Sequence, residues 1–245
     1  MTGPEPQARR DELAASLVQV RQRIGHACTA AGRDPGSVTL VAVTKTYPAS
    51  DVVLLAELGV TDTGENKDQE AAAKAAAVRA AGATPRWHFV GQLQRNKAKS
   101  VVTYADVVES VDSTRLAGAL SSAAARLRDV PLDVLVQVSI DGDPARGGAV
   151  ADGAEPDRDL WRVAAAVQEA EGLRLGGLMA VAPREWEPER AFATLAELAG
   201  RLRAGHPDAT VVSAGMSGDL EQAVAHGATH VRIGTSLLGK RNTLR

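Results

Sequence analysis

The feature that most constrains the fold of this chain is a regular alternation of apolar, β-branched stretches with helical patterns. Eight such pairs follow one another after a first amphipathic helix. Strands that each lead into a helix are expected to run parallel and to be joined by right-handed crossovers. Eight units favour closure into a (β/α)8 TIM barrel over an open sheet. The open sheet would predict a G-x-G-x-x-G sequence after an early strand, and the chain contains none.

The expected elements follow from the apolar periodicity. Residues 1–10 are polar, contain two prolines and are predicted to be frayed, which leaves a single domain over residues 11–245. The predicted strands span residues 37–44, 61–64, 87–90, 106–111, 132–140, 173–179, 210–213 and 230–233. The predicted helices that follow them span residues 49–58, 67–81, 94–102, 114–127, 160–170, 189–203 and 219–225, with a short helical end. The connection 141–159 is too long for an ordinary loop, and the sequence favours disorder over a mobile lid.

Composition narrows the class of protein. Aromatic residues make up only 3% of the chain, so the core must be built from aliphatic side chains, as in the interior of such barrels. A net charge of −2 and scattered basic residues give no reason to expect nucleic-acid or membrane partners. Cys28 is the single cysteine, and the polar amino terminus lacks the apolar region of a secretory signal. We therefore expect a cytoplasmic protein.

Lys45 directly follows the first apolar strand. In these barrels the working face is the carboxyl end of the strands, so its amine is expected at the mouth of the barrel. Partial burial of its base would lower the pKa of the amine and favour attack on a carbonyl. A strand-end lysine in a salt bridge is the structural alternative.

Two loops near the carboxyl terminus suggest a phosphate site. Residues 213–219 read SAGMSGD and residues 232–236 read RIGTS, and they follow the seventh and eighth strands. The loops after these two strands are the usual phosphate site of the fold. Small residues expose backbone N–H groups and hydroxyls add donors, although turns need the same residues.

A lysine nucleophile and a phosphate site at one mouth fit two kinds of ligand. One is pyridoxal phosphate, and the other is a phosphosugar cleaved by a lysine-dependent aldolase. Arg232 favours the first, because it lies beside the phosphate loop where it could face the ring nitrogen of a pyridine. A guanidinium donates but cannot accept a proton, so that nitrogen would stay unprotonated and the cofactor would be a weak electron sink. A structural ion pair is the alternative for Arg232.

Six segments together resemble a known family. LVAVTKTYP, GENKDQE, WHFVGQLQRNK, GLMAV, SAGMSGDLEQAV and VRIGTSLLG closely match the pyridoxal phosphate homeostasis proteins, in order and spacing, over residues 12 to 240. The resemblance implies a barrel related to the amino-terminal domain of alanine racemase. It implies that Lys45 holds pyridoxal 5'-phosphate as a Schiff base. The other cofactor-binding residues implied by the matching motifs are Asn66, Ser213, Met216, Ser217, Arg232, Gly234 and Thr235.

The third-strand motif and the long connection are less easily assigned. His88, Gln92 and Asn96 belong to a family motif, but for His88 a packed barrel histidine is the preferred interpretation. Family members often have Lys-x-Gly in the long connection, where this chain has Arg146 followed by two glycines. Any role of that lysine in transferring the cofactor is therefore in doubt here.

The resemblance also implies a carrier or regulator of vitamin B6 without established catalytic activity, with apo-enzymes as transient acceptors. A racemase of this class needs a second acid/base from an added β-domain, for which the sequence leaves no room. We expect Tyr47 to be a loop or packing residue, and Tyr104 lies at a helix end. No metal spacing is present among the five histidines. A small racemase and an aldolase remain the alternatives, no residue is assigned a catalytic role, and we expect a monomer.

Overall fold

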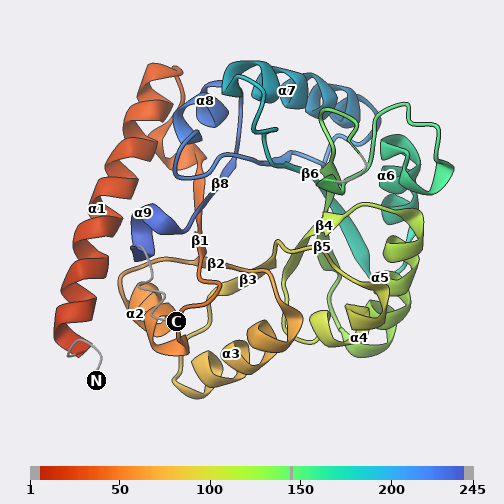
Figure 1. Ribbon diagram of the computed structural model, residues 1–245. Helices are drawn as coiled ribbons and strands as arrows, with labels where there is room; N and C mark the ends of the chain where they lie inside the picture. Colours follow the sequence, from red (N-terminus) through yellow and green to blue (C-terminus); the bar gives the residue numbers. More distant parts are fainter. Residues whose placement is uncertain (1–5, 144–145, 240–245) are drawn as a thin grey trace.

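The computed structural model describes residues 6–143 and 146–239. Eight parallel strands form a closed barrel in sequence order, and β8 pairs with β1 to complete it. Helices surround the strands as a ring (Figure 1). The predicted (β/α)8 barrel with an extra amino-terminal helix is therefore confirmed.

The strands are short, and most lie within one or two residues of the predicted ranges. They are β1 (Thr39–Val43), β2 (Asp62–Glu65), β3 (Arg86–Phe89), β4 (Val107–Val111), β5 (Leu132–Val138), β6 (Leu173–Ala180), β7 (Val211–Ser213) and β8 (His230–Ile233). The helices are α1 (Pro6–Ala30), α2 (Ala49–Glu57), α3 (Asp68–Ala80), α4 (Ala98–Val101), α5 (Thr114–Leu127), α6 (Leu160–Glu169), α7 (Pro188–Gly205), α8 (Leu220–Ala225) and α9 (Thr235–Leu238).

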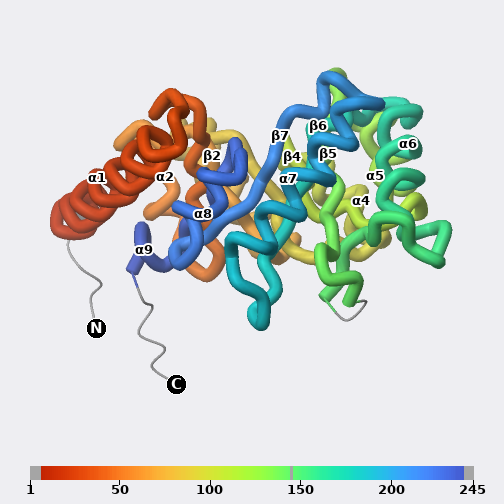
Figure 2. Tube along the Cα trace, turned by 90° about the horizontal axis from the view of Figure 1, so that it is seen from above, coloured from red at the N-terminus to blue at the C-terminus, as the bar shows by residue number. Residues whose placement is uncertain are grey.

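The extra helix α1 lies outside the ring and packs against α2, α8 and α9 (Figure 2). Its apolar face is buried as the spacing predicted, with Leu13, Leu17 and Cys28 among the buried residues. The helix begins at Pro6, so fraying over residues 6–10 is not observed. The reason is Arg9, whose guanidinium binds the Asp51 carboxylate on α2 at 2.7 Å and so fixes this end of the helix. Residues 1–5 lie outside the described residues.

The connection 141–159 was predicted to be disordered, and for its described residues that prediction is wrong. Ala149 forms a parallel bridge with Val138, and Val150 forms another with Asp159. The Asp157 carboxylate accepts a hydrogen bond of 2.6 Å from the Thr114 hydroxyl on α5. Backbone pairing and these side-chain contacts hold a segment whose glycine and proline content had suggested disorder.

Candidate functional site

Lys45 lies two residues beyond the end of β1, at the carboxyl-terminal mouth of the barrel. It is exposed, and within the described residues it makes no hydrogen bond or ion pair. The salt bridge that was the structural alternative is thus not observed. The next residue, Thr46, has a φ of 70°, a left-handed conformation that is uncommon for a β-branched side chain.

Asn66 directly follows β2 on the same mouth. Its side-chain Oδ1 is buried and has no hydrogen-bond partner among the described residues. The turn after β3 packs tightly on its backbone, because a Cβ added at Gly91 would lie 2.1 Å from the Asn66 carbonyl oxygen. Only glycine allows this approach, and it fixes Asn66 in place. A buried acceptor without a partner marks a place where a ligand donor would fit.

The two predicted phosphate loops meet at the mouth. The Ser236 N–H points to the Ser217 hydroxyl at 3.4 Å, which joins the loop after β7 to the loop after β8. Gly215 has a φ of 90°, and an added Cβ would lie 2.6 Å from the Ala223 Cβ, so this turn requires glycine. Met216 is 40% exposed, and its N–H donates to the Asp219 carboxylate at 2.6 Å. Gly234 begins α9, with Thr235 exposed beside it.

Arg232 and Ser213 lie deeper, inside the barrel. The Arg232 guanidinium donates to the Ser213 hydroxyl at 2.8 Å and to the Ala180 carbonyl at 2.9 Å. The Ser213 hydroxyl in turn donates to Glu109 at 2.6 Å, so its donor is already used. Burial lowers the pKa of Arg232, while Glu109, 3.9 Å away, acts in the opposite direction. The Ser213 hydroxyl, at the start of the loop after β7, is therefore bonded to Arg232 and Glu109, and its contact with a phosphate stays a prediction.

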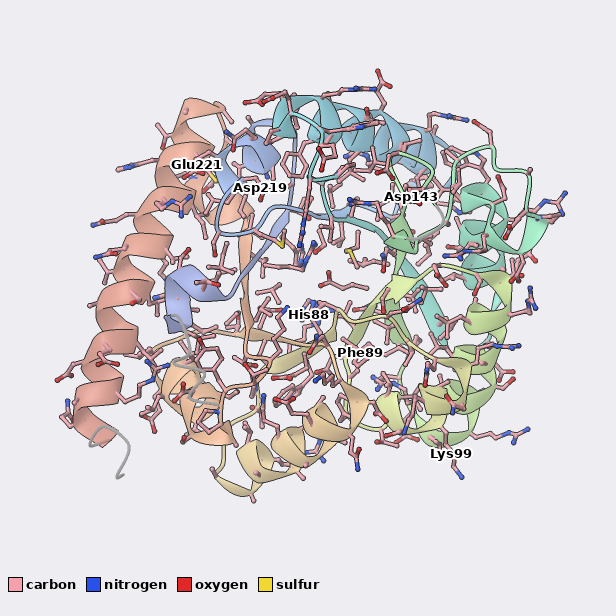
Figure 3. All side chains as sticks on the ribbon, viewed as in Figure 1. His88, Phe89, Lys99, Asp143, Asp219 and Glu221 are labelled. Atoms are coloured by element: carbon pink, nitrogen blue, oxygen red, sulfur yellow. The ribbon has the colours of Figure 1, made fainter. Side chains whose placement is uncertain are left out.

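Glu109 belongs to a series of buried, mutually bonded charged side chains in the lumen of the barrel. Its Oε1 lies 2.6 Å from His88 Nδ1, and His88 Nε2 lies 2.9 Å from Asp62 Oδ1. Burial alone would lower the pKa of His88, but the hydrogen bonds to Asp62 and Glu109 raise it to about 9. Burial alone would raise the pKa of Glu109, but His88 and Arg232 lower it to about 2. His88 lies among the strands in the middle of the barrel (Figure 3).

Glu109 is the main residue of this chain that sequence reasoning missed. It stands in an otherwise apolar strand, VVESV, and it is fully buried. A carboxylate in such a strand is costly unless it is paired, and that exception to the apolar pattern was the available signal. His88 is a buried barrel histidine, as preferred, but it is an ion-paired one.

The remaining predicted positions lie around the mouth. Gln92 is exposed and lines a cleft of about 590 Å³ next to Asn66, whereas Asn96 is exposed and does not line it. Arg146 donates to the Val181 carbonyl at 2.8 Å, at the end of β6, and its Nε lies 3.4 Å from Asp141.

The described residues include neither a metal-binding cluster nor a membrane-spanning helix. They contain no cluster of three or more His, Cys, Asp or Glu side chains that could hold a metal ion. Within the same ranges, each helix is too short or too polar to cross a membrane.

Comparison with known proteins gives consistent results over nearly the whole chain. The profile of the alanine racemase N-terminal domain matches residues 16–242. The pyridoxal phosphate homeostasis proteins of Mycobacterium tuberculosis and Escherichia coli K12 are 46% and 38% identical to this chain, each over 95% of it and over 94% and 98% of their own lengths.

Solved structures agree. PipY of Synechococcus elongatus, determined with pyridoxal phosphate bound, is 32% identical with a TM-score of 0.76, and the match covers 93% of this chain and all of PipY. A protein of unknown function from Bifidobacterium adolescentis is 31% identical with a TM-score of 0.85, over 96% and 98% of the two chains. Alanine racemase from Corynebacterium glutamicum, at 15% identity and a TM-score of 0.67, shares the fold, and the match covers 96% of this chain and 64% of that one.

Proposed function

Because this chain belongs to the family of pyridoxal phosphate homeostasis proteins, we propose that it binds pyridoxal 5'-phosphate at the barrel mouth and acts in the balance of that cofactor. The observation that carries the proposal is the set of groups at the mouth that lack partners. Lys45 is an amine free of any ion pair within the described residues, and Asn66 Oδ1 is a buried acceptor without a donor. These groups fit the aldehyde and the polar substituents of the cofactor.

Lys45 is proposed to hold the cofactor covalently. Pyridoxal phosphate supplies an aldehyde that bonds reversibly to a primary amine, and an exposed lysine at the mouth is the group that meets it. Asn66 would lie beside the ring. Gly234, Thr235, Met216 and Ser217 offer backbone N–H groups and hydroxyls for the phosphate. The Met216 N–H would have to exchange its Asp219 acceptor for a phosphate oxygen.

Arg232 is proposed to face the pyridine nitrogen, held in place by Ser213. Its guanidinium is anchored from inside the barrel by the Ser213 hydroxyl and the Ala180 carbonyl. Because Glu109 compensates its charge, Arg232 remains a donor and supplies no proton to the ring. An unprotonated ring stabilises a carbanion poorly, which favours holding the cofactor over turning over amino acids.

We further propose a carrier rather than an enzyme. The Tyr47 hydroxyl donates to the Gly239 carbonyl at 2.6 Å. The Tyr104 hydroxyl lies near the Asp68 carboxylate, and burial raises its pKa. Both hydroxyls thus already have partners, which supports a carrier over a racemase. Transient acceptors of the cofactor would be apo-enzymes that use it, and the protein would act as a monomer.

The test uses the full-length protein with added pyridoxal phosphate, followed by borohydride reduction and peptide mass spectrometry. We expect one stable adduct, on Lys45. Lys45→Ala should lose the adduct and keep part of its affinity for the cofactor through the phosphate loops. Lys67→Ala, which removes a nearby exposed lysine, is the matched control and should behave as the parent. A parent protein that forms no adduct, or one formed equally by Lys45→Ala, would contradict the proposal.

Two further assays separate the remaining functions. Transfer of the cofactor from the loaded protein to an apo-enzyme would support the carrier function. Lys45-dependent turnover of a free amino acid would favour a small racemase instead, and cleavage of a sugar phosphate would favour an aldolase.

A further inference from the structure

We propose that Lys74, Glu65 and Glu70 form a clamp that holds the backbone on both sides of Lys45 and so positions its amine for the carbonyl of the cofactor. The three residues lie on β2 and α3, and they are called the β2–α3 clamp below. The inference rests on the proposed function, because it concerns how Lys45 reacts.

The clamp contacts both peptide groups that flank Lys45. Lys74 Nζ donates to the Thr44 carbonyl oxygen at 2.8 Å, before Lys45. The Thr46 N–H, after Lys45, donates to Glu70 Oε1 at 2.7 Å. The same ammonium joins the two contacts, since it lies 3.3 Å from Glu70 Oε1. One cluster of charges thus fixes the chain immediately before and after the reactive lysine.

The conformation of Thr46 supports a positional role. A φ of 70° is strained for a β-branched residue. Such a conformation persists only where its surroundings hold it, and the Glu70 carboxylate bound to the Thr46 N–H supplies that hold. The strained turn follows β1 and leads the chain toward α2.

The chemistry of the clamp argues against a purely stabilising role. Lys74 Nζ lies 2.6 Å from Glu65 Oε1, and their side chains are only 5% and 1% exposed. A buried ion pair is rarely more stable than packed apolar residues of the same size. Glu65 Oε2 is also buried and has no hydrogen-bond partner in the described part of the chain, and burial raises the pKa of its carboxyl group. A cluster that gains so little stability is better explained by the geometry it imposes.

The clamp also links Lys45 to Asn66, which follows the neighbouring strand β2. Glu65 ends β2 directly before Asn66, and Glu70 and Lys74 lie one turn apart on α3. The Thr44 hydroxyl donates to Glu65 Oε1 at 2.7 Å, which adds a second bond between β1 and β2. Movement of α3 would therefore shift Lys45 and Asn66 together. Residues of α3 thus hold the Lys45 backbone in a fixed place relative to Asn66.

The experiment compares covalent and non-covalent binding in Glu70→Ala and Lys74→Met. The first probe is pyridoxal 5'-phosphate, whose reaction with Lys45 is followed by absorbance and by borohydride trapping. The second is pyridoxine 5'-phosphate, which carries an alcohol in place of the aldehyde and cannot bond to the amine. In both variants we expect the rate of adduct formation to fall about tenfold or more, because small displacements of a reacting group are costly. The affinity for pyridoxine 5'-phosphate should stay within about twofold.

Two control variants accompany the experiment. Glu70→Gln retains an oxygen acceptor for the Thr46 N–H and should restore most of the lost rate. Lys99→Met, at an exposed lysine of α4 outside the cleft, should match the parent. Glu70 is partly exposed, so its variants test the clamp even if Lys74→Met does not fold.

Unchanged adduct formation in Glu70→Ala would overturn the clamp, and so would an equal loss for both probes. Failure of the parent to form an adduct would instead overturn the proposed function.

Discussion

The lumen of the barrel and its mouth differ in how their polar groups are paired. In the lumen, His88, Glu109, Ser213 and Arg232 are buried, and each is bonded to the next. At the mouth, Lys45 is exposed without an ion pair among the described residues, and the buried Oδ1 of Asn66 has no donor. The two regions are built from the same eight strands. They differ in whether the protein itself supplies hydrogen-bond or ion-pair partners for these groups.

This difference separates stability from binding. A buried chain of alternating charges is self-sufficient, so removal of one member leaves another charge without compensation. Removal of an unpartnered polar group at the mouth should change the free energy of unfolding little, because the protein had gained nothing from that group on folding. Substitutions in the lumen should therefore act mainly on the free energy of unfolding, and substitutions at the mouth mainly on affinity for the cofactor.

The largest effect is expected for Glu109→Leu. This change leaves the positive charges of His88 and Arg232 buried without their shared carboxylate, which should lower the free energy of unfolding by about 3–5 kcal/mol. Urea denaturation followed by circular dichroism measures the change. Glu109→Gln keeps the size and an acceptor and should cost less. A variant as stable as the parent would mean that the lumen chain is not the paired network described above.

A smaller effect should appear in the pH dependence of the free energy of unfolding. The pKa of His88 is raised to about 9 from its ordinary 6.5, so its contribution to stability is fully present below pH 6.5. That contribution is lost as the pH rises through 9, and the expected loss is on the order of 2 kcal/mol. The pKa of Glu109 is lowered to about 2 from 4.5, so its contribution is present above pH 4.5 and is lost as the pH falls through 2.

The measurement is the free energy of unfolding at intervals between pH 6 and pH 10. The parent should lose stability across this range, and His88→Gln should show a flatter profile because it carries no ionisable group there. Equal slopes for the two proteins would show that His88 is not the titrating group. A variant at the mouth, Lys67→Ala, is the comparison: its free energy of unfolding should change with pH as steeply as that of the parent.

The same contrast explains what could be predicted from sequence. The alternation of apolar strands and helices predicted the barrel, since its period depends on local pattern alone. Lys45 and the glycine-containing loops were predicted because a strand end and a turn leave local signals. The partnership of Glu109 with His88 was not predictable, because the two residues come from different strands. The clamp was not predictable for a similar reason: helical spacing relates Lys74 to Glu70 four residues away, while its shorter contact is to Glu65 on β2.

The smallest effect on stability, and the sharpest test of the contrast, is expected for Asn66→Ala. Because Asn66 Oδ1 has no partner within the described residues, its loss should change the free energy of unfolding by less than about 0.5 kcal/mol. The affinity for pyridoxine 5'-phosphate should fall about two- to tenfold, the value of one hydrogen bond to a ligand. Asn96→Ala, at an exposed position outside the cleft, is the matched control and should change neither quantity. A variant that loses stability but keeps its affinity would place Asn66 with the lumen residues. The distinction between a lumen whose polar groups pair within the protein and a mouth whose polar groups pair with a ligand would then be wrong.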